Sequence, residues 1–135
     1  MIVVDTSAWI DYFNGVEAPH TRVLDFDLQH SRIVTGDLII AELLQGFKTD
    51  KDFQSARRLL ACLEYRDMVG REVAIEAASN YRKLRKKGIT IRKTMDMLIA
   101  TFCIRNDMAL IHNDRDFDAL EEHLKLRVRR FPAAG

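Results

Sequence analysis

The sequence predicts an α/β sandwich in which helices cover a central parallel sheet. Short, continuous apolar runs alternate with segments of helical periodicity along the whole chain, as connected parallel strands require. An apolar fraction of 47% in 135 residues is enough to fill one hydrophobic core. The chain has no internal repeats and no Pro- or Gly-rich linkers, so we expect a single domain over residues 1–135.

The expected elements follow in chain order from these patterns. The run over 1–4 is apolar and rich in β-branched residues, which is typical of a strand buried on both faces. Thr6 or Ser7 can cap the next helix, and Asp37 can cap the helix that begins at Leu38. The predicted strands cover 1–4, 33–35, 67–69, 109–112 and 128–131, and the predicted helices cover 6–13, 17–30, 38–46, 51–65, 72–87, 94–106 and 116–123.

Cysteine and histidine usage argues against disulfides and zinc. Cys62 and Cys103 lie far apart in apolar, helical stretches without a C-x-x-C pattern, so we expect two buried free thiols. The four histidines show no zinc-type spacing. No apolar run approaches the roughly 18 residues of a membrane span, and the start lacks the basic region of a signal peptide. We therefore expect a cytoplasmic protein with no membrane association.

Two aspartates follow predicted strands directly. Asp5 ends the strand IVV, and Asp114 follows the strand ALIH; each lies just before a predicted helix. In parallel α/β sheets the carboxyl ends of the strands are where ligands bind. The structural alternative is that each aspartate only caps its helix.

Two further acids interrupt apolar helices. Glu42 lies within LIIAELLQ, a helix that is apolar on nearly every side, and no lysine or arginine stands three or four residues away to pair with it. Asp96 lies in the first turn of the helix TMDMLIATFCI and shares the face of Ile99, Ala100 and Cys103. A carboxylate buried on such a face is costly unless it is paired or bound to a metal.

If these four acids converge, they need a cation. Two carboxylates about 4 Å apart repel by roughly 4 kcal/mol at an effective dielectric constant near 20. Hard oxygen ligands without His or Cys favour Mg²⁺ or Mn²⁺ over Zn²⁺. Such a site is suited to phosphoester hydrolysis by a metal-activated water. The P-loop and nucleophile-elbow motifs are absent from the chain, which excludes those two chemistries.

A basic stretch runs from Arg82 to Lys93, with seven basic residues in twelve and no acid. A solvated helix end would account for a few of these cations. Their number favours a phosphate-binding surface, together with more basic residues near the C-terminus. The candidates for RNA contact are Arg85, Lys86, Lys87, Arg92 and Lys93.

Four segments of the chain resemble PIN-domain proteins, and specifically the VapC-type toxins of VapBC toxin–antitoxin pairs. They are VVDTSAWIDYF, IIAELLQGF, GITIRKTMDMLIATFC and ALIHNDRDFDAL, in that order and at spacings typical of the family. The resemblance covers essentially the whole chain. It implies a Rossmann-like, three-layer α/β/α sandwich in which the strands that carry Asp5 and Asp114 are neighbours.

The resemblance also assigns residues to the site. The four family acids match Asp5, Glu42, Asp96 and Asp114 in turn, as catalytic residues and as metal ligands. The fourth family acid varies in position, so Asp116 or Asp118 can share the role of Asp114. Thr6, Ser7, Asn113 and Asp116 match supporting polar positions.

As a function, the resemblance implies an endoribonuclease toxin that depends on Mg²⁺ or Mn²⁺ and leaves 5′-phosphate and 3′-hydroxyl ends. The expected partners are RNA, a second copy in a homodimer, and a VapB-like antitoxin whose tail enters the acidic groove. The alternative is a non-catalytic PIN-like module that binds RNA or protein. The sequence does not identify the RNA target, the cleavage site, the antitoxin or the number of metal ions.

Overall fold

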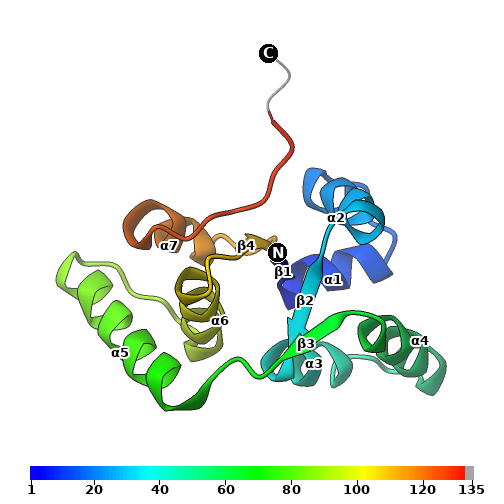
Figure 1. The fold of residues 1–135 in the computed structure, drawn as a ribbon, viewed down its shortest axis with the longest axis horizontal. Helices are drawn as coiled ribbons and strands as arrows, with labels where there is room; N and C mark the ends of the chain where they lie inside the picture. Colours follow the sequence, from blue (N-terminus) through cyan, green and yellow to red (C-terminus); the bar gives the residue numbers. More distant parts are fainter. Residues whose placement is uncertain (133–135) are drawn as a thin grey trace.

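A four-stranded, all-parallel sheet forms the centre of the molecule, with the strand order β3-β2-β1-β4 (Figure 1). The computed structural model describes residues 1–132, so the last three residues of the expected domain lie outside the described part. The strands are β1 (Ile2–Val4), β2 (Ile33–Gly36), β3 (Glu64–Arg66) and β4 (Ala109–Ile111). The predicted parallel-sheet architecture is confirmed.

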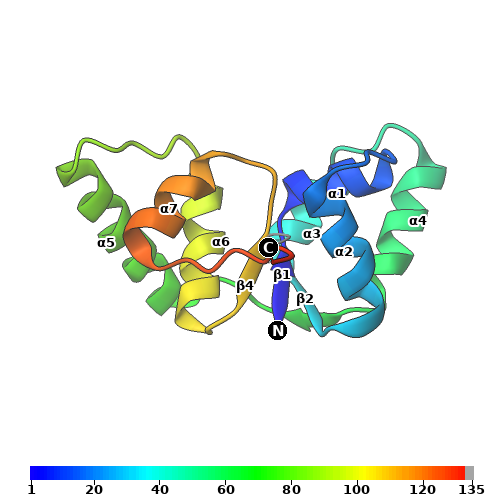
Figure 2. The ribbon, with the colours of Figure 1, turned by 90° about the horizontal axis from the view of Figure 1, so that it is seen from above.

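Helices cover both sides of this sheet (Figure 2). One layer holds the helices of the first half of the chain and the other holds those of the second half, as a three-layer sandwich requires. The helices are α1 (Thr6–Phe13), α2 (Pro19–His30), α3 (Asp37–Leu44), α4 (Asp50–Ala61), α5 (Gly70–Lys86), α6 (Thr94–Arg105) and α7 (Asp116–Leu124). No helix in residues 1–132 is long and apolar enough to cross a membrane.

Two predicted strands are wrong. The third strand is β3, which lies three residues before the predicted 67–69 and shortens the preceding helix to end at Ala61. β3 is a half-exposed edge strand with polar residues, whereas the apolar Met68 that suggested a strand is a buried loop residue. Instead of the predicted strand over 128–131, a single bridge joins Val128 to Leu110 of β4.

The helix caps also differ from the prediction. Asp5, rather than Thr6 or Ser7, caps α1, and its Oδ2 accepts a hydrogen bond from the Ser7 backbone N–H at 3.0 Å. Asp37 does not cap α3 but is its first residue. Its Oδ1 accepts hydrogen bonds from the Leu38 N–H at 3.1 Å and from the Met68 N–H at 2.9 Å. A carboxylate accepts from several donors, so Asp37 can serve both the helix start and the loop after β3.

The two cysteines have different environments. Cys103 is buried in α6 as expected, and this burial raises the pKa of its thiol. Cys62 is exposed, which contradicts the prediction of two buried thiols. It lies at the C-terminal cap of α4, where the helix ends before the edge strand and leaves the thiol at the surface.

A buried ion pair fixes the C-terminal segment to the body of the protein. Asp27 of α2 is fully buried, and its two carboxylate oxygens accept hydrogen bonds from Arg129 Nε at 2.9 Å and Nη2 at 3.0 Å. Ser31 Oγ donates a further bond to Asp27 at 2.7 Å. The segment makes its one bridge to the sheet and then lies between α7 and α2 (Figures 1 and 2), where Arg129 joins it to α2.

Candidate metal centre

The carboxyl ends of the neighbouring strands β1 and β4 bring Asp5 and Asp114 to the same edge of the sheet. β1 and β4 are parallel neighbours, with Val4 beside Ile111, so the predicted adjacency of these strands is confirmed. The Asp5 N–H donates to the Ile111 carbonyl at 2.9 Å, which fixes the start of α1 against the end of β4. Asp114 follows three residues after Ile111.

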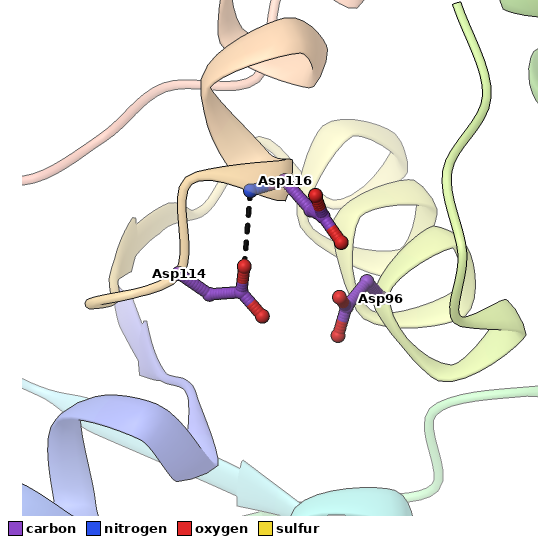
Figure 3. A group of neighbouring side chains, drawn as sticks. All are labelled: Asp96, Asp114 and Asp116. Atoms are coloured by element: carbon purple, nitrogen blue, oxygen red, sulfur yellow. Dashed lines mark hydrogen bonds between the residues drawn. The ribbon is translucent and has the colours of Figure 1, made fainter.

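Three aspartates form a tight group at this edge. Asp96, Asp114 and Asp116 each offer a carboxylate oxygen, and these oxygens all lie within 4.8 Å of one another. Figure 3 shows Asp96 on α6 facing the other two across a gap. The Asp116 N–H donates to Asp114 Oδ1 at 3.0 Å, so the start of α7 orients the Asp114 carboxylate. Asp118, the other alternative for the fourth acid, is exposed and lies outside this group.

Asp5 lies beside this group and is held by Ser7. Its side chain is 4% exposed, and its Oδ2 accepts hydrogen bonds from the Ser7 hydroxyl at 2.6 Å and the Ser7 N–H at 3.0 Å. Burial raises the pKa of Asp5, the Ser7 bonds oppose this, and the charges of Glu42 and Asp114 raise the pKa further. These charges place Asp5 in the same electrostatic cluster.

Glu42, like Asp5, is not among the acids whose oxygens meet within 4.8 Å, and it is less buried than its sequence context suggests. It is half-buried on α3, and its neighbour Ala41 is exposed, so α3 has a solvent-facing side. The prediction of a fully buried glutamate is therefore wrong: the helix has only eight residues and packs on one face. Its carboxylate nevertheless raises the pKa of both Asp5 and Asp96.

The acids fit a divalent cation. Three buried carboxylate oxygens, Asp5 Oδ1, Asp96 Oδ2 and Asp116 Oδ2, have no hydrogen-bond partner within residues 1–132. Burial, followed by the charges of Asp5 and Asp114, raises the pKa of Asp96 to about 7. Buried anionic oxygens without donors are costly, and a hard cation satisfies several at once. Oxygen-only ligands favour Mg²⁺ or Mn²⁺.

Two of the five predicted RNA-binding cations lie against this group. Lys93 Nζ is 3.8 Å from Asp114 Oδ2, and Arg92 Nε is 3.8 Å from Asp116 Oδ2. Both side chains are mostly exposed, so a phosphate that approaches the acids would meet them. Arg85, Lys86 and Lys87 are also exposed but lie at the end of α5, away from any of these contacts.

Comparison with known proteins identifies the family. The family model of the PIN domain matches residues 2–122. The chain belongs to the PIN-domain family. Within this family it is similar to Ribonuclease VapC11 of Mycobacterium tuberculosis, with 32% identity over 134 residues that cover 97% of this chain and 99% of that protein. It is also similar, with the same identity and coverage, to VapC ribonuclease Mb1587 of Mycobacterium bovis.

Solved structures share the PIN fold. VapBC2 from Rickettsia felis, bound to a DNA fragment from its promoter, gives a TM-score of 0.73 at 23% identity and covers 96% of this chain and 98% of that one. DNA-bound VapBC from Salmonella typhimurium gives 0.74 at 21% identity, with 95% and 96% covered. At these identities the likeness establishes the fold.

Sequence reasoning named some of the polar residues at the site of this PIN domain and missed others. Asp116 was expected as a support and as an alternative to Asp114 for the fourth acid, and it shares the tight group together with Asp114; the D-x-D spacing at the start of a helix is the signal that points to it. Thr6 is buried and its hydroxyl has no partner among the described residues. Asp11 and His20 join the site through Asn113, and no sequence pattern indicates this.

The pH dependence of stability provides a test of the acid cluster. Burial and the nearby acids raise the pKa of Asp96 to about 7 from the ordinary aspartate value of 3.8, so between these pH values the metal-free folded state holds a proton that the unfolded state has lost. We expect the free energy of unfolding in chelator to fall as pH rises from about 4 to about 7. The reason is that stability decreases with rising pH wherever the folded state binds more protons than the unfolded state.

The variant Asp96→Asn isolates this effect. Between pH 5 and pH 7.5 the wild type should lose about 2 kcal/mol more than the variant, since one pKa unit corresponds to 1.36 kcal/mol. Urea denaturation in EDTA at the two pH values measures the difference. Equal losses in both proteins would mean that Asp96 titrates normally and that the acids do not crowd one another.

Proposed function

We propose that this PIN domain is a Mg²⁺- or Mn²⁺-dependent endoribonuclease and the toxin of a type II toxin–antitoxin pair. The observation that carries the proposal is the group of three aspartates within 4.8 Å at the carboxyl edge of a parallel sheet. Two of them, Asp96 and Asp116, each have a buried oxygen without a hydrogen-bond donor among residues 1–132. The similar mycobacterial proteins are named as ribonucleases, which supports RNA hydrolysis as the reaction.

Each polar residue of the site has a distinct task in this proposal. Asp5, Asp96, Asp114 and Asp116 would hold the cation, with Glu42 adding negative charge beside them. A bound Mg²⁺ or Mn²⁺ would supply an activated water and neutralise charge that develops on the phosphate. Ser7 fixes the Asp5 carboxylate, and the Asp116 N–H fixes that of Asp114.

The cations near the acids would bind the substrate. Lys93 and Arg92 lie 3.8 Å from carboxylate oxygens of the site, where they can contact a phosphate that approaches the acids. The middle of the basic stretch, Arg85, Lys86 and Lys87 at the end of α5, would contact the RNA backbone farther from the acids. Phosphate contacts of this kind position the chain without reading its sequence.

We also propose that a VapB-like antitoxin silences the enzyme and that the toxin forms a homodimer. The solved structures of similar fold include VapBC complexes from several bacteria, which supports a protein partner. A cluster of carboxylates favours a cationic inhibitor, so an arginine from the antitoxin tail is the expected group at the acids.

Cleavage of single-stranded RNA by the purified protein tests the enzymatic proposal. We expect no cleavage in EDTA, recovery with Mg²⁺ or Mn²⁺, and products with 5′-phosphate and 3′-hydroxyl ends. Cleavage in EDTA, or 2′,3′-cyclic phosphate ends, would contradict the metal-dependent reaction. Binding of RNA without cleavage under all metal conditions would favour the alternative of a non-catalytic module.

A matched pair of variants on α7 separates a site acid from a surface acid. Asp116→Asn should lower the cleavage rate by at least about 10-fold, the lower range for loss of a group that orients or supports metal ligands. Asp118→Asn, which changes an exposed acid two residues away, should leave the rate unchanged. Equal effects of the two variants on the cleavage rate would mean that Asp116 is not an acid of the site.

The role of the site cations is tested by the salt dependence of RNA binding in EDTA. The double variant Arg92→Ala/Lys93→Ala should weaken binding and reduce the slope of log affinity against log salt by up to about 2, since each phosphate contact contributes about 1. Lys48→Ala/Lys51→Ala on the α4 side is the control. If both pairs give the same slope, Arg92 and Lys93 do not contact the RNA.

A further inference from the structure

A cavity whose lining contains none of the site acids has no role in the proposed reaction. It has a volume of about 460 Å³ and lies between the start of α2, the end of β4 and the C-terminal segment over 128–131. Asn113, which directly precedes Asp114, forms part of its wall. This volume falls within the range of about 300–1,000 Å³ that is typical of small-ligand sites.

Asp11 of α1 holds two polar side chains at this cavity. Its Oδ2 lies 2.6 Å from His20 Nε2 and accepts a hydrogen bond from Asn113 Nδ2 at 2.9 Å. Both His20 and Asn113 line the cavity. With these bonds made, His20 Nδ1 and Asn113 Oδ1 form no hydrogen bond within residues 1–132, so each side chain keeps a group that can bind a ligand.

The same hydrogen-bond network reaches the acid cluster. The Asn113 backbone N–H donates to Ser7 Oγ at 2.9 Å, and Ser7 Oγ donates to Asp5 Oδ2 at 2.6 Å. The wall of the cavity and the Asp5 carboxylate are therefore fixed relative to each other by an unbroken chain of bonds. A ligand held at Asn113 would have a defined position relative to the acids.

The C-terminal segment supplies an aromatic wall. Phe131 lines the cavity and is 44% exposed, although it is a large apolar side chain. The Arg129 guanidinium lies over its ring at 5.6 Å, and the Phe26 ring meets it edge to face at 5.6 Å. Since Arg129 is itself anchored on the buried Asp27, Phe131 is held in place with one part of its surface free.

We propose that this cavity binds one unpaired nucleobase of the RNA substrate, an inference that rests on the proposed ribonuclease function. Proteins read single-stranded RNA by stacking a splayed base on an aromatic or arginine side chain and by bonding the edge of the base to fixed polar groups. Phe131 provides the stacking surface, and His20 and Asn113, both held by Asp11, provide the edge contacts. The cavity thus selects the base beside the cleaved bond.

Cleavage of RNA oligonucleotides that differ in a single base next to the cleaved bond tests this proposal. We expect the wild type to prefer certain bases at one position and the variants His20→Ala and Phe131→Ala to lose that preference. The loss of base stacking in Phe131→Ala should weaken binding of the favoured RNA by about 5- to 100-fold. His123→Ala and Tyr65→Ala, which change a histidine and an exposed aromatic residue outside the cavity, should keep the preference.

A binding experiment without metal makes the inference independent of cleavage. Nuclear magnetic resonance titration with AMP, GMP, CMP and UMP should shift the side-chain amide of Asn113 and the ring of Phe131 with at least one nucleotide. If wild-type RNA cleavage occurs but neither variant changes the base preference, the cavity proposal is wrong and the proposed function stands.

Two further outcomes bear on the cavity. If no RNA is cleaved, the proposed ribonuclease function is wrong. In that case, nucleotide-dependent resonance shifts at Asn113 and Phe131 would still support nucleobase binding in the cavity. The absence of such shifts would contradict it. If His20→Ala and Phe131→Ala weaken binding of the antitoxin but not of RNA or nucleotides, the cavity is a peptide site and the proposal is overturned.

Discussion

Replacement of Asp96 by asparagine is expected to abolish RNA cleavage and the inhibition of bacterial growth, with a loss in rate of more than about 100-fold. Loss of a group that only supports a metal ligand already costs about 10- to 100-fold, and Asp96 is a ligand candidate in its own right. Asparagine has nearly the same size but no charge. The rate of cleavage of a single-stranded RNA in saturating Mg²⁺ or Mn²⁺ measures the effect.

The thermal stability of Asp96→Asn shows whether a loss of activity comes from a loss of folding. Asp96 is 3% exposed and is surrounded by the charges of Asp5, Asp114 and Glu42, so removing its charge relieves repulsion in the absence of metal. Asp96→Asn should therefore unfold at the same or a higher temperature than the wild type in EDTA. Asp5→Asn should lose activity in the same way, and undiminished activity in either variant would remove that residue from the site.

Arg129→Ala is expected to cost about 3–5 kcal/mol of stability, the range for breaking a buried ion pair by removal of one partner. The reason is Asp27, which is fully buried and accepts two hydrogen bonds from the Arg129 guanidinium. Without Arg129, only Ser31 remains as a donor to this carboxylate among the described side chains. Urea denaturation at neutral pH gives the difference in the free energy of unfolding.

A double variant and a surface control sharpen this measurement. Asp27→Leu combined with Arg129→Met removes both charges and should recover most of the lost stability, because no buried charge is left unpaired. Arg127→Ala breaks an exposed pair with Asp107 and should cost at most about 1 kcal/mol. If Arg129→Ala costs no more than Arg127→Ala, the C-terminal segment is not anchored through Asp27.

The fold was largely predictable because local patterns determine most of its elements. β1, β2 and β4 are buried, apolar runs, and the helices α5 to α7 have helical periodicity with clear ends, so the sequence places them within a few residues. The edge strand β3 was misplaced because an edge strand with polar residues has no local apolar signature. Its position depends on pairing with β2, which is a long-range property.

The candidate site was predictable in its residue types but not in its geometry. Asp5 and Asp114 stand out because they end predicted strands, yet their proximity depends on β1 and β4 pairing across more than half of the chain. Asp116 joins Asp96 and Asp114 only through the turn at the start of α7. The bonds of Asp11 to His20 and Asn113 connect three separate elements, and no periodicity or spacing rule could have found them.

Calorimetric titration of the metal-free protein with Mn²⁺ tests most directly whether the carboxylates form a metal site. We expect binding by the wild type and by the exposed-acid control Asp118→Asn, and binding at least about 10-fold weaker in Asp96→Asn. All three proteins should be folded at the pH of the titration, as checked by circular dichroism. Mn²⁺ binding of equal strength in Asp96→Asn and the wild type would contradict a metal site at these carboxylates.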